Sequence, residues 1–229
     1  MGLATAEALA ADGANVAMFA RRRELLEREA ERIGALAVRG DLTNPTHLRA
    51  LVETTVSAFG TVDVLVLNSG GPPRSTAAGV TDADVEEAVE LLLLSATRLT
   101  TLCLPYLRPS GHGRIVAITS SSVREPIPGL ALSNTVRPGL VGWLKTLARE
   151  LGPDGVTVNV IAPGRIDTER IREVYPDGLT DADLEAIPLR RLGAPREVGD
   201  VICFLASDRA AYVTGAVIPV DGGLTRGLL

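Results

Sequence analysis

Short apolar runs alternate with helical patterns along this 229-residue chain, and this alternation is what most constrains its fold. The apolar runs show no in–out alternation, which is typical of strands that helices cover on both faces, as in a parallel sheet. We expect strands near residues 16–19, 35–38, 62–67, 114–118, 156–161 and 216–220. We expect helices near residues 3–11, 22–33, 45–58, 82–107, 134–151 and 196–206. Alternating units of this kind predict an α/β fold with a doubly wound parallel sheet.

Length and composition bound the kind of protein. With 229 residues, of which 46 % are hydrophobic, the chain is most simply one domain over residues 1–229. A net charge of −5 provides no overall basic field for nucleic acid or an anionic membrane. No apolar run approaches the length of a membrane span. We therefore expect a cytoplasmic protein that binds neither nucleic acid nor membrane.

The cysteines and histidines do not predict a metal site. Cys103 and Cys203 fall within apolar helical stretches, which is typical of core residues in a reducing compartment. His47 and His112 stand alone, without the spacing of metal ligands. We expect no bound metal.

The region between residues 114 and 168 carries the candidate chemistry. A strand there ends in Thr119-Ser120-Ser121, a long helix follows, and a second strand leads into Pro163-Gly-Arg-Ile-Asp-Thr168. This order resembles the second half of the short-chain dehydrogenase/reductase family. The later run Val220-Asp-Gly-Gly223 is similar to the family's C-terminal signature. The resemblance covers essentially the whole chain and implies a Rossmann-like fold.

Three residues occupy the catalytic positions that the resemblance implies. Ser120 aligns with the serine that hydrogen-bonds the substrate carbonyl, although a serine in a Ser run is also ordinary turn chemistry. Ser133 stands at the position of the family tyrosine, which supplies the proton, and Arg137 at that of its lysine. A serine hydroxyl is a weak acid and arginine does not deprotonate, so the proton donor is unassigned. Arg137 retains the ability to hold the nicotinamide ribose.

Two further positions bear on catalysis. The position of the family's catalytic Asn, on the long helix before residue 107, is Leu92. Of the tyrosines, only Tyr175 lies in the segment that resembles the substrate lid, and it is the one candidate for a substitute acid.

The N-terminal residues resemble the helix that follows the family's glycine-rich phosphate loop. Gly2 then corresponds to the last glycine of that loop, whose backbone N–H groups approach the cofactor pyrophosphate. The first strand and the earlier glycines have no counterpart, so we expect a sheet without its first strand. A start assigned too late at an internal Met explains this, and a chain that evolved in this form is the alternative.

The run Arg21-Arg22-Arg23 follows the first predicted strand. At this place an acidic residue would hold the ribose of NAD, whereas arginine matches the 2′-phosphate of NADP. A solvated helix start is the alternative, but three cations there are unfavourable beside the helix dipole. We therefore expect Arg21 and Arg22 to bind NADP, with NAD less favoured.

The remaining cofactor positions follow other strands at the carboxyl edge of the sheet, where open α/β sheets bind ligands. The resemblance places the adenine near Asp41 and Leu42, although Asp41 also suits a turn. Asn68 and Gly70 resemble the family's Asn-Asn-Ala-Gly loop. The nicotinamide contacts that the resemblance implies are Pro163, Gly164, Ile166 and Thr168, together with Arg137 at the ribose.

Two hypotheses of function follow. The first is an atypical NADP-dependent oxidoreductase, similar to 3-oxoacyl-carrier-protein reductases, acting on a small carbonyl or secondary alcohol. The second is a catalytically silent Rossmann-fold binding or structural subunit. The long helices carry apolar residues outside the single stripe that faces the core, and such a second apolar face is usually covered by a partner subunit. We therefore expect a homotetramer or homodimer.

Overall fold

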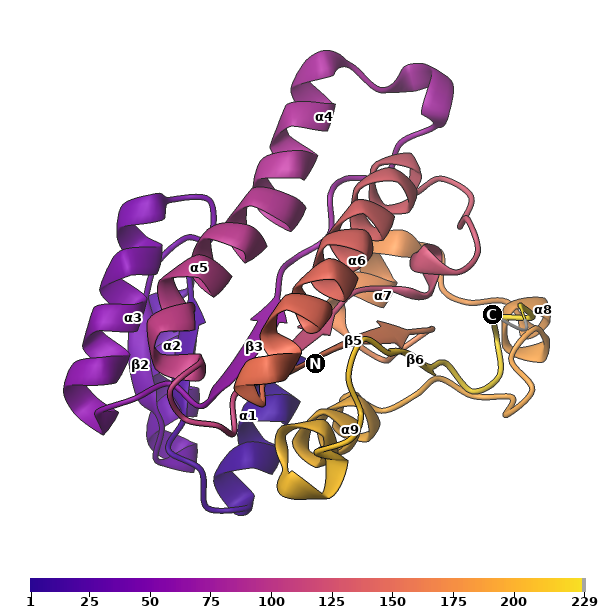
Figure 1. Ribbon diagram of the computed structural model, residues 1–229. Coiled ribbons are helices and arrows are strands. Elements are labelled where there is room, and N and C mark those ends of the chain that lie inside the picture. Colours follow the sequence, from indigo (N-terminus) through magenta and orange to yellow (C-terminus); the bar gives the residue numbers. More distant parts are fainter. Residues whose placement is uncertain (228–229) are drawn as a thin grey trace.

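The computed structural model describes residues 1–227 and contains every strand and helix expected above (Figure 1). The strands are β1 (Ala17–Ala20), β2 (Leu36–Arg39), β3 (Val64–Asn68), β4 (Arg114–Ile118), β5 (Thr157–Pro163) and β6 (Val217–Val220). The expected helices are α1 (Gly2–Ala11), α2 (Arg23–Ile33), α3 (Pro45–Phe59), α4 (Asp82–Val89), α5 (Ser95–Leu107), α6 (Ala131–Leu151) and α9 (Pro195–Ala206). Two short helices in the lid-like segment were not predicted: α7 (Glu169–Val174) and α8 (Asp181–Glu185).

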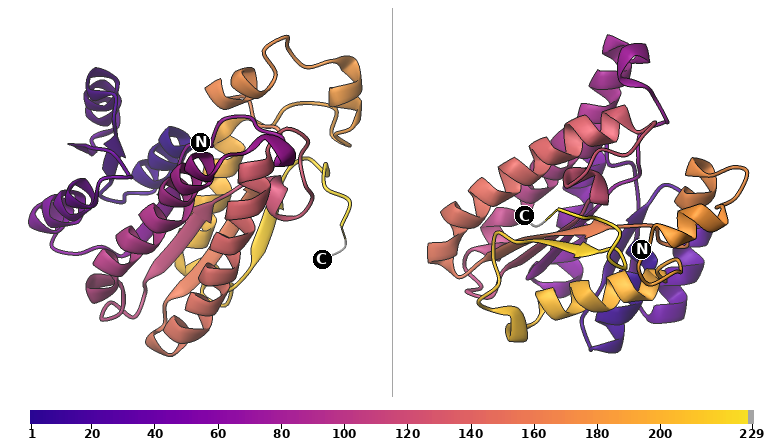
Figure 2. Two further views of the ribbon diagram at one scale, coloured as in Figure 1. Left: turned by 90° about the horizontal axis from the view of Figure 1, so that it is seen from above. Right: turned by 90° about the vertical axis from the view of Figure 1, so that its right-hand side faces the viewer.

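All strand pairs are parallel, and within residues 1–227 they form two sheets. One sheet pairs β1 with β2, and the other has the order β3-β4-β5-β6. No described strand lies between β1 and β3, so the doubly wound sheet is divided there. In Figure 2 (left) the indigo and purple segments of the smaller sheet lie beside the larger one. The expectation of an α/β fold that lacks its first strand is confirmed.

Helices cover both faces of the larger sheet, and the alternation of β4 shows this. Ile115 and Ala117 contribute to the main core, which α3, α5 and α6 close on one face. Val116 and Ile118 contribute to a second cluster, which α9 closes on the other face. Every residue of β4 and β5 is buried, as expected for central strands with helices on both sides.

The helix pair α4–α5 runs on through a π-helical turn, Glu90–Leu94, as one helical stretch, Asp82–Leu107. By length and composition this stretch is apolar enough to cross a membrane. It lies against the sheet instead, where Leu99, Cys103 and Leu107 are buried in the main core. Its apolar residues are therefore those of a core helix.

Candidate active site

Ser133 and Arg137 are the centre of the candidate site. Helix α6 begins at Ala131, three residues before the expected start at 134, so both residues lie inside it, one turn apart. Arg137 Nε donates to Ser133 Oγ at 3.1 Å, and Arg137 Nη2 donates to the Gly70 carbonyl at 3.1 Å. Both side chains are buried, with 5 % and 6 % of their residue surface exposed. Arg137 thus links α6 to the loop after β3.

The hydroxyl that contacts Ser133 comes from Ser122, which the sequence analysis did not select. Ser120, after β4, accepts from the Ser122 backbone N–H at 3.1 Å. The Ser122 side chain then lies 3.2 Å from Ser133 Oγ, and both are buried. The only sequence signal for Ser122 is the Thr-Ser-Ser-Ser run, which does not say which hydroxyl turns inward.

The electrostatics around Arg137 are unusual. Burial, and secondarily the charge of Arg170 on α7, lower the Arg137 pKa to about 10, which leaves it protonated at neutral pH. Arg170 reaches the same loop, because its Nη2 donates to the Pro72 carbonyl at 2.6 Å. No local pattern predicts the approach of Arg170, because α7 and the loop after β3 are far apart along the chain.

Leu92 belongs to the π-helical turn, and it is only 1 % exposed. It packs in a small cluster with Leu132 and Val136, which flank Ser133 on α6. Its role in this structure is packing, and the turn that carries it is a form frequently found near functional sites.

Gly2, at the start of α1, lies close to Asn68 at the end of β3. A Cβ atom on Gly2 would come within 2.5 Å of Asn68 Nδ2, so a side chain there would collide with it. The structure thus brings the N-terminus of α1 to the carboxyl edge of β3. Free N–H groups at a helix N-terminus suit the phosphates of a nucleotide.

The arginines after β1 are exposed, but carboxylates of the chain already lie near them. Arg22 pairs with Glu169 of α7 at 3.3 Å, and Arg21 lies 3.9 Å from Asp41. Arg23 pairs with Glu27 within α2. These carboxylates offset part of the positive charge, and the contacts between segments are not visible in the sequence. Binding of NADP by Arg21 and Arg22 stays a prediction.

The residues after β2 act locally in this structure. Asp41 accepts from the backbone N–H and the hydroxyl of Thr43, at 3.0 and 2.8 Å. These bonds are the main reason why the Asp41 pKa lies below its usual value. Leu42 packs against the main core. The interpretation of Asp41 as a turn residue is confirmed. A contact of Asp41 with the adenine stays a prediction.

The segment after β5 returns to the sheet edge in a tight path. Gly164 lies against Asp221, whose Cα would be 2.8 Å from a Cβ at that position. Ile166 is buried in the second cluster, so its side chain is part of the core. Thr168 donates its hydroxyl to the Ile166 carbonyl at 3.3 Å and precedes α7. Pro163 ends β5 and is buried.

Tyr175 follows α7, and its hydroxyl accepts from Arg165 Nε at 3.2 Å. The Arg165 guanidinium also lies 5.4 Å from the centre of the Tyr175 ring and pairs with Asp183. The structure therefore joins Tyr175 to the lid segment and does not bring it to Ser133.

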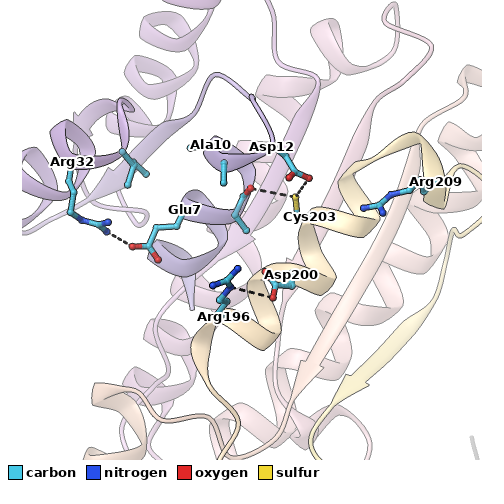
Figure 3. A pocket seen from close by; sticks show the side chains of 11 residues that line it. Glu7, Ala10, Asp12, Arg32, Arg196, Asp200, Cys203 and Arg209 are labelled. Atoms are coloured by element: carbon cyan, nitrogen blue, oxygen red, sulfur yellow. Dashed lines mark hydrogen bonds and ion pairs between the residues drawn. The ribbon is translucent and has the colours of Figure 1, made fainter.

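A cavity of about 670 Å³ is lined by none of the candidate site residues (Figure 3). It opens between α1, α2 and α9, and its lining includes Glu7, Arg32 and Cys203. Burial and the nearby Asp12 carboxylate raise the Cys203 pKa to about 11, so this thiol is not a ready nucleophile. We assign no chemistry to this cavity.

The doubly wound fold and the polar loops at its carboxyl edge define a Rossmann-like protein with a nucleotide-type site. Over residues 1–225 the chain matches the enoyl-(acyl carrier protein) reductase family. This chain belongs to the short-chain dehydrogenase/reductase family of NAD(P)-dependent oxidoreductases.

Known relatives match most of the chain. The 3-oxoacyl-(acyl-carrier-protein) reductase FabG of Escherichia coli is 34 % identical over 226 residues, which are 98 % of this chain and 92 % of that protein. A cyclohexanol dehydrogenase of Rhodococcus is 36 % identical over 198 residues, covering 83 % of this chain and 73 % of that one.

Solved structures agree in fold. A short-chain oxidoreductase of Pseudomonas aeruginosa, with NADPH bound and an atypical catalytic centre, is 32 % identical with a TM-score of 0.92, covering 99 % of this chain and 93 % of its own. An NADPH-dependent reductase of bacilysin biosynthesis has a TM-score of 0.95, but at 23 % identity it supports the fold alone.

Proposed function

We propose that this protein is an atypical NADP-dependent reductase of small carbonyl compounds, similar in activity to 3-oxoacyl reductases. The observation that carries the proposal is the buried pair Ser133–Arg137, held between Ser122 and the Gly70 carbonyl. It lies where the loops after β3 and β4 meet α6, at the carboxyl edge of the larger sheet.

The residues at this edge fit a dinucleotide. The N-terminus of α1 at Gly2 supplies free N–H groups for the pyrophosphate, and exposed Arg21 and Arg22 supply charge for a 2′-phosphate. Asn68, Gly70 and the segment from Pro163 to Thr168 lie at the ends of β3 and β5. A bound NADPH would supply the hydride for reduction of a carbonyl.

The chain's own residues would orient the carbonyl and hold a proton near its oxygen. Arg137 Nε donates to Ser133 Oγ, so the Ser133 proton is left to donate to the Ser122 hydroxyl or to a substrate oxygen. A cationic donor in a buried site also favours loss of that proton. Ser120 remains the proposed contact of the carbonyl oxygen, and Arg137 that of the ribose.

The test of this proposal has two parts. The first is titration of NADPH and NADH, with tighter NADPH binding expected. The second is oxidation of NADPH in the presence of 3-oxoacyl thioesters and small ketones. If neither cofactor binds, the proposal fails.

The alternative is a catalytically silent binding subunit. Ser133 favours it, because an aliphatic hydroxyl is a weaker acid than a phenol. NADPH binding without oxidation by any carbonyl substrate would support this alternative.

A further inference from the structure

Two buried arginines of this protein differ in how their charge is neutralised. Arg114 is 3 % exposed, and its guanidinium lies 3.2 Å from the Asp208 carboxylate. Arg137 is 6 % exposed, and both of its hydrogen-bond acceptors, the Ser133 hydroxyl and the Gly70 carbonyl, are neutral. No Asp or Glu in residues 1–227 forms an ion pair with Arg137. A buried charge without a counter-charge is costly, and the fold avoids that cost at Arg114.

The surroundings of Arg137 add positive charge to the site. Arg170 is close enough to disfavour the charged form of Arg137. Arg170 has a carboxylate of its own, because its Nη1 donates to Glu173 at 2.9 Å. The site therefore has one positive charge, that of Arg137, for which the described residues supply no negative counter-charge.

The hydrogen bonds around Arg137 also leave donors free. A guanidinium only donates, so Ser133 Oγ must accept the bond from Arg137 Nε. The Ser133 and Ser122 hydroxyls share one contact of 3.2 Å, in which one of them donates. The other hydroxyl proton is available to a ligand. A guanidinium beside a hydroxyl donor is a donor set that suits a carboxylate.

We propose that the missing counter-ion is a carboxylate of the substrate, so that the protein acts on oxo acids or the matching hydroxy acids. This inference rests on the proposed function, because it names the substrate class of that site. One unmatched charge suits a monovalent carboxylate. A phosphate group carries roughly 1.5–2 negative charges at neutral pH, and it would leave part of that charge buried without a partner.

The test compares two ligands that differ in one charge, acetoacetate and its neutral methyl ester. Dissociation constants are measured by NMR on the protein with and without NADP⁺. Acetoacetate should bind more tightly than the ester. In the absence of NADP⁺, Arg137→Met should weaken acetoacetate binding by roughly 10- to 100-fold and leave ester binding unchanged, as expected for loss of a charged hydrogen bond. The affinity of the variant for NADP⁺ is measured separately, because Arg137 is also the proposed contact of the ribose. Arg137→Lys should restore part of the affinity. Arg149→Met, at an exposed position of the same helix, is the matched control and should change nothing.

Each other outcome decides between the two proposals. Equal binding of acid and ester, no binding of either, or acetoacetate binding that survives Arg137→Met would overturn the oxo-acid inference. Binding of chloride or inorganic phosphate, detected by the same NMR titration and lost in Arg137→Met, would overturn it too. NADPH oxidation with the ester but not with acetoacetate would leave the reductase proposal standing and remove this one. Arg137-dependent acetoacetate binding without NADPH oxidation would support the oxo-acid inference and remove the reductase proposal.

Discussion

The charge of Arg137 should have a measurable cost in stability. Burial lowers the Arg137 pKa from its ordinary value to about 10, so the cost is fully present below pH 10 and falls as pH rises above 10 toward the ordinary pKa of arginine. Arg137→Met should raise the free energy of unfolding at pH 7 by about 1–3 kcal/mol. It removes the cost of the buried charge, at about 1.4 kcal/mol for each unit of pKa shift, and the two lost hydrogen bonds reduce this gain. Urea unfolding of both proteins at pH 7 and pH 10.5 tests this. The difference should shrink at the higher pH, and a less stable variant at pH 7 would contradict the prediction.

Restoring the family residues at 133 and 137 tests the catalytic assignment. Ser133→Tyr with Arg137→Lys should raise the rate of carbonyl reduction, because a positioned general acid contributes about 10²–10⁴-fold. Ser133→Tyr alone should do less, since it lacks the compact lysine contact to the ribose. Steady-state NADPH oxidation measures both, with circular dichroism as the control for folding, because the ring must fit beside Leu92. A lowered rate in the double variant, with activity lost in Ser120→Ala, would mean that the protein uses another mechanism.

The exposed arginines after β1 provide a test of cofactor preference. Replacing Arg21 and Arg22 by Ala should weaken NADPH binding by about 1.5–3 kcal/mol for each lost charged hydrogen bond. NADH binding should change little. Fluorescence titration of both cofactors measures this, with Arg23→Ala as the control because Arg23 pairs with Glu27 inside α2. Equal losses for the two cofactors would remove the role of Arg21 and Arg22 in phosphate binding.

At the scale of single residues, the sequence predicts what lies close along one helix. Ser133 and Arg137 are four residues apart, and the earlier start of α6 at Ala131 places both on one helix face, where that spacing brings them into contact. The inward turn of Ser122 and the approach of Arg170 depend on how distant segments pack, and no local pattern encodes them. The same holds for Glu169, which supplies the counter-charge of Arg22.

The packing of α1 on α9 depends on a glycine. A Cβ on Gly199 would lie 2.7 Å from the Ala4 carbonyl oxygen and 3.1 Å from the Thr5 amide nitrogen, both backbone atoms that cannot turn aside. Gly199→Ala should therefore destabilise the protein by about 1–3 kcal/mol. Gly142→Ala is the matched control, because nothing lies within 4 Å of its Cβ, and it should stabilise by about 0.5–1 kcal/mol. Thermal unfolding of both variants checks the pair, and similar effects at the two sites would contradict it.

Most elements with strong local signals were predicted well, but α8 was missed although Thr180 and Asp183 form a capping box at its start. The start of α3 was visible because Asn44 accepts from the N–H groups of Thr46 and His47. The start of α6 was missed because Leu130, its N-cap, makes no side-chain capping bond. Helices α7 and α8 are short and half exposed, so they carry no apolar stripe from which a helix could be predicted.

The association of whole molecules remains a prediction. Leu91, Leu93 and Trp143 are only half buried in the single chain, and the Tyr212 side chain is fully exposed. Apolar surface beyond the core is usually covered by a partner. Light scattering coupled to gel filtration should give a dimer or tetramer at micromolar concentration. A monomer at that concentration would remove the prediction.

The overall arrangement followed from the sequence because buried parallel strands and capped helices leave few ways to connect them. The sheet was expected to lack its first strand, and in the described residues the strands fall into two sheets at that place. The sequence alone does not predict which segments connect or contact the two sheets.

The division of the sheet should also appear in how the protein opens. Within residues 1–227 no strand hydrogen bonds join β1 to β3, so the unit of β1, α2 and β2 is held to the rest by side-chain packing and by exposed ion pairs such as Arg32–Glu7. Such units tend to open at lower free energy than the core of a domain. Amide hydrogen exchange should therefore occur in two steps: β1 and β2 exchange first, while β4 and β5 exchange only on global unfolding. Uniform protection of all six strands would show that side-chain contacts alone couple the two sheets into one cooperative unit.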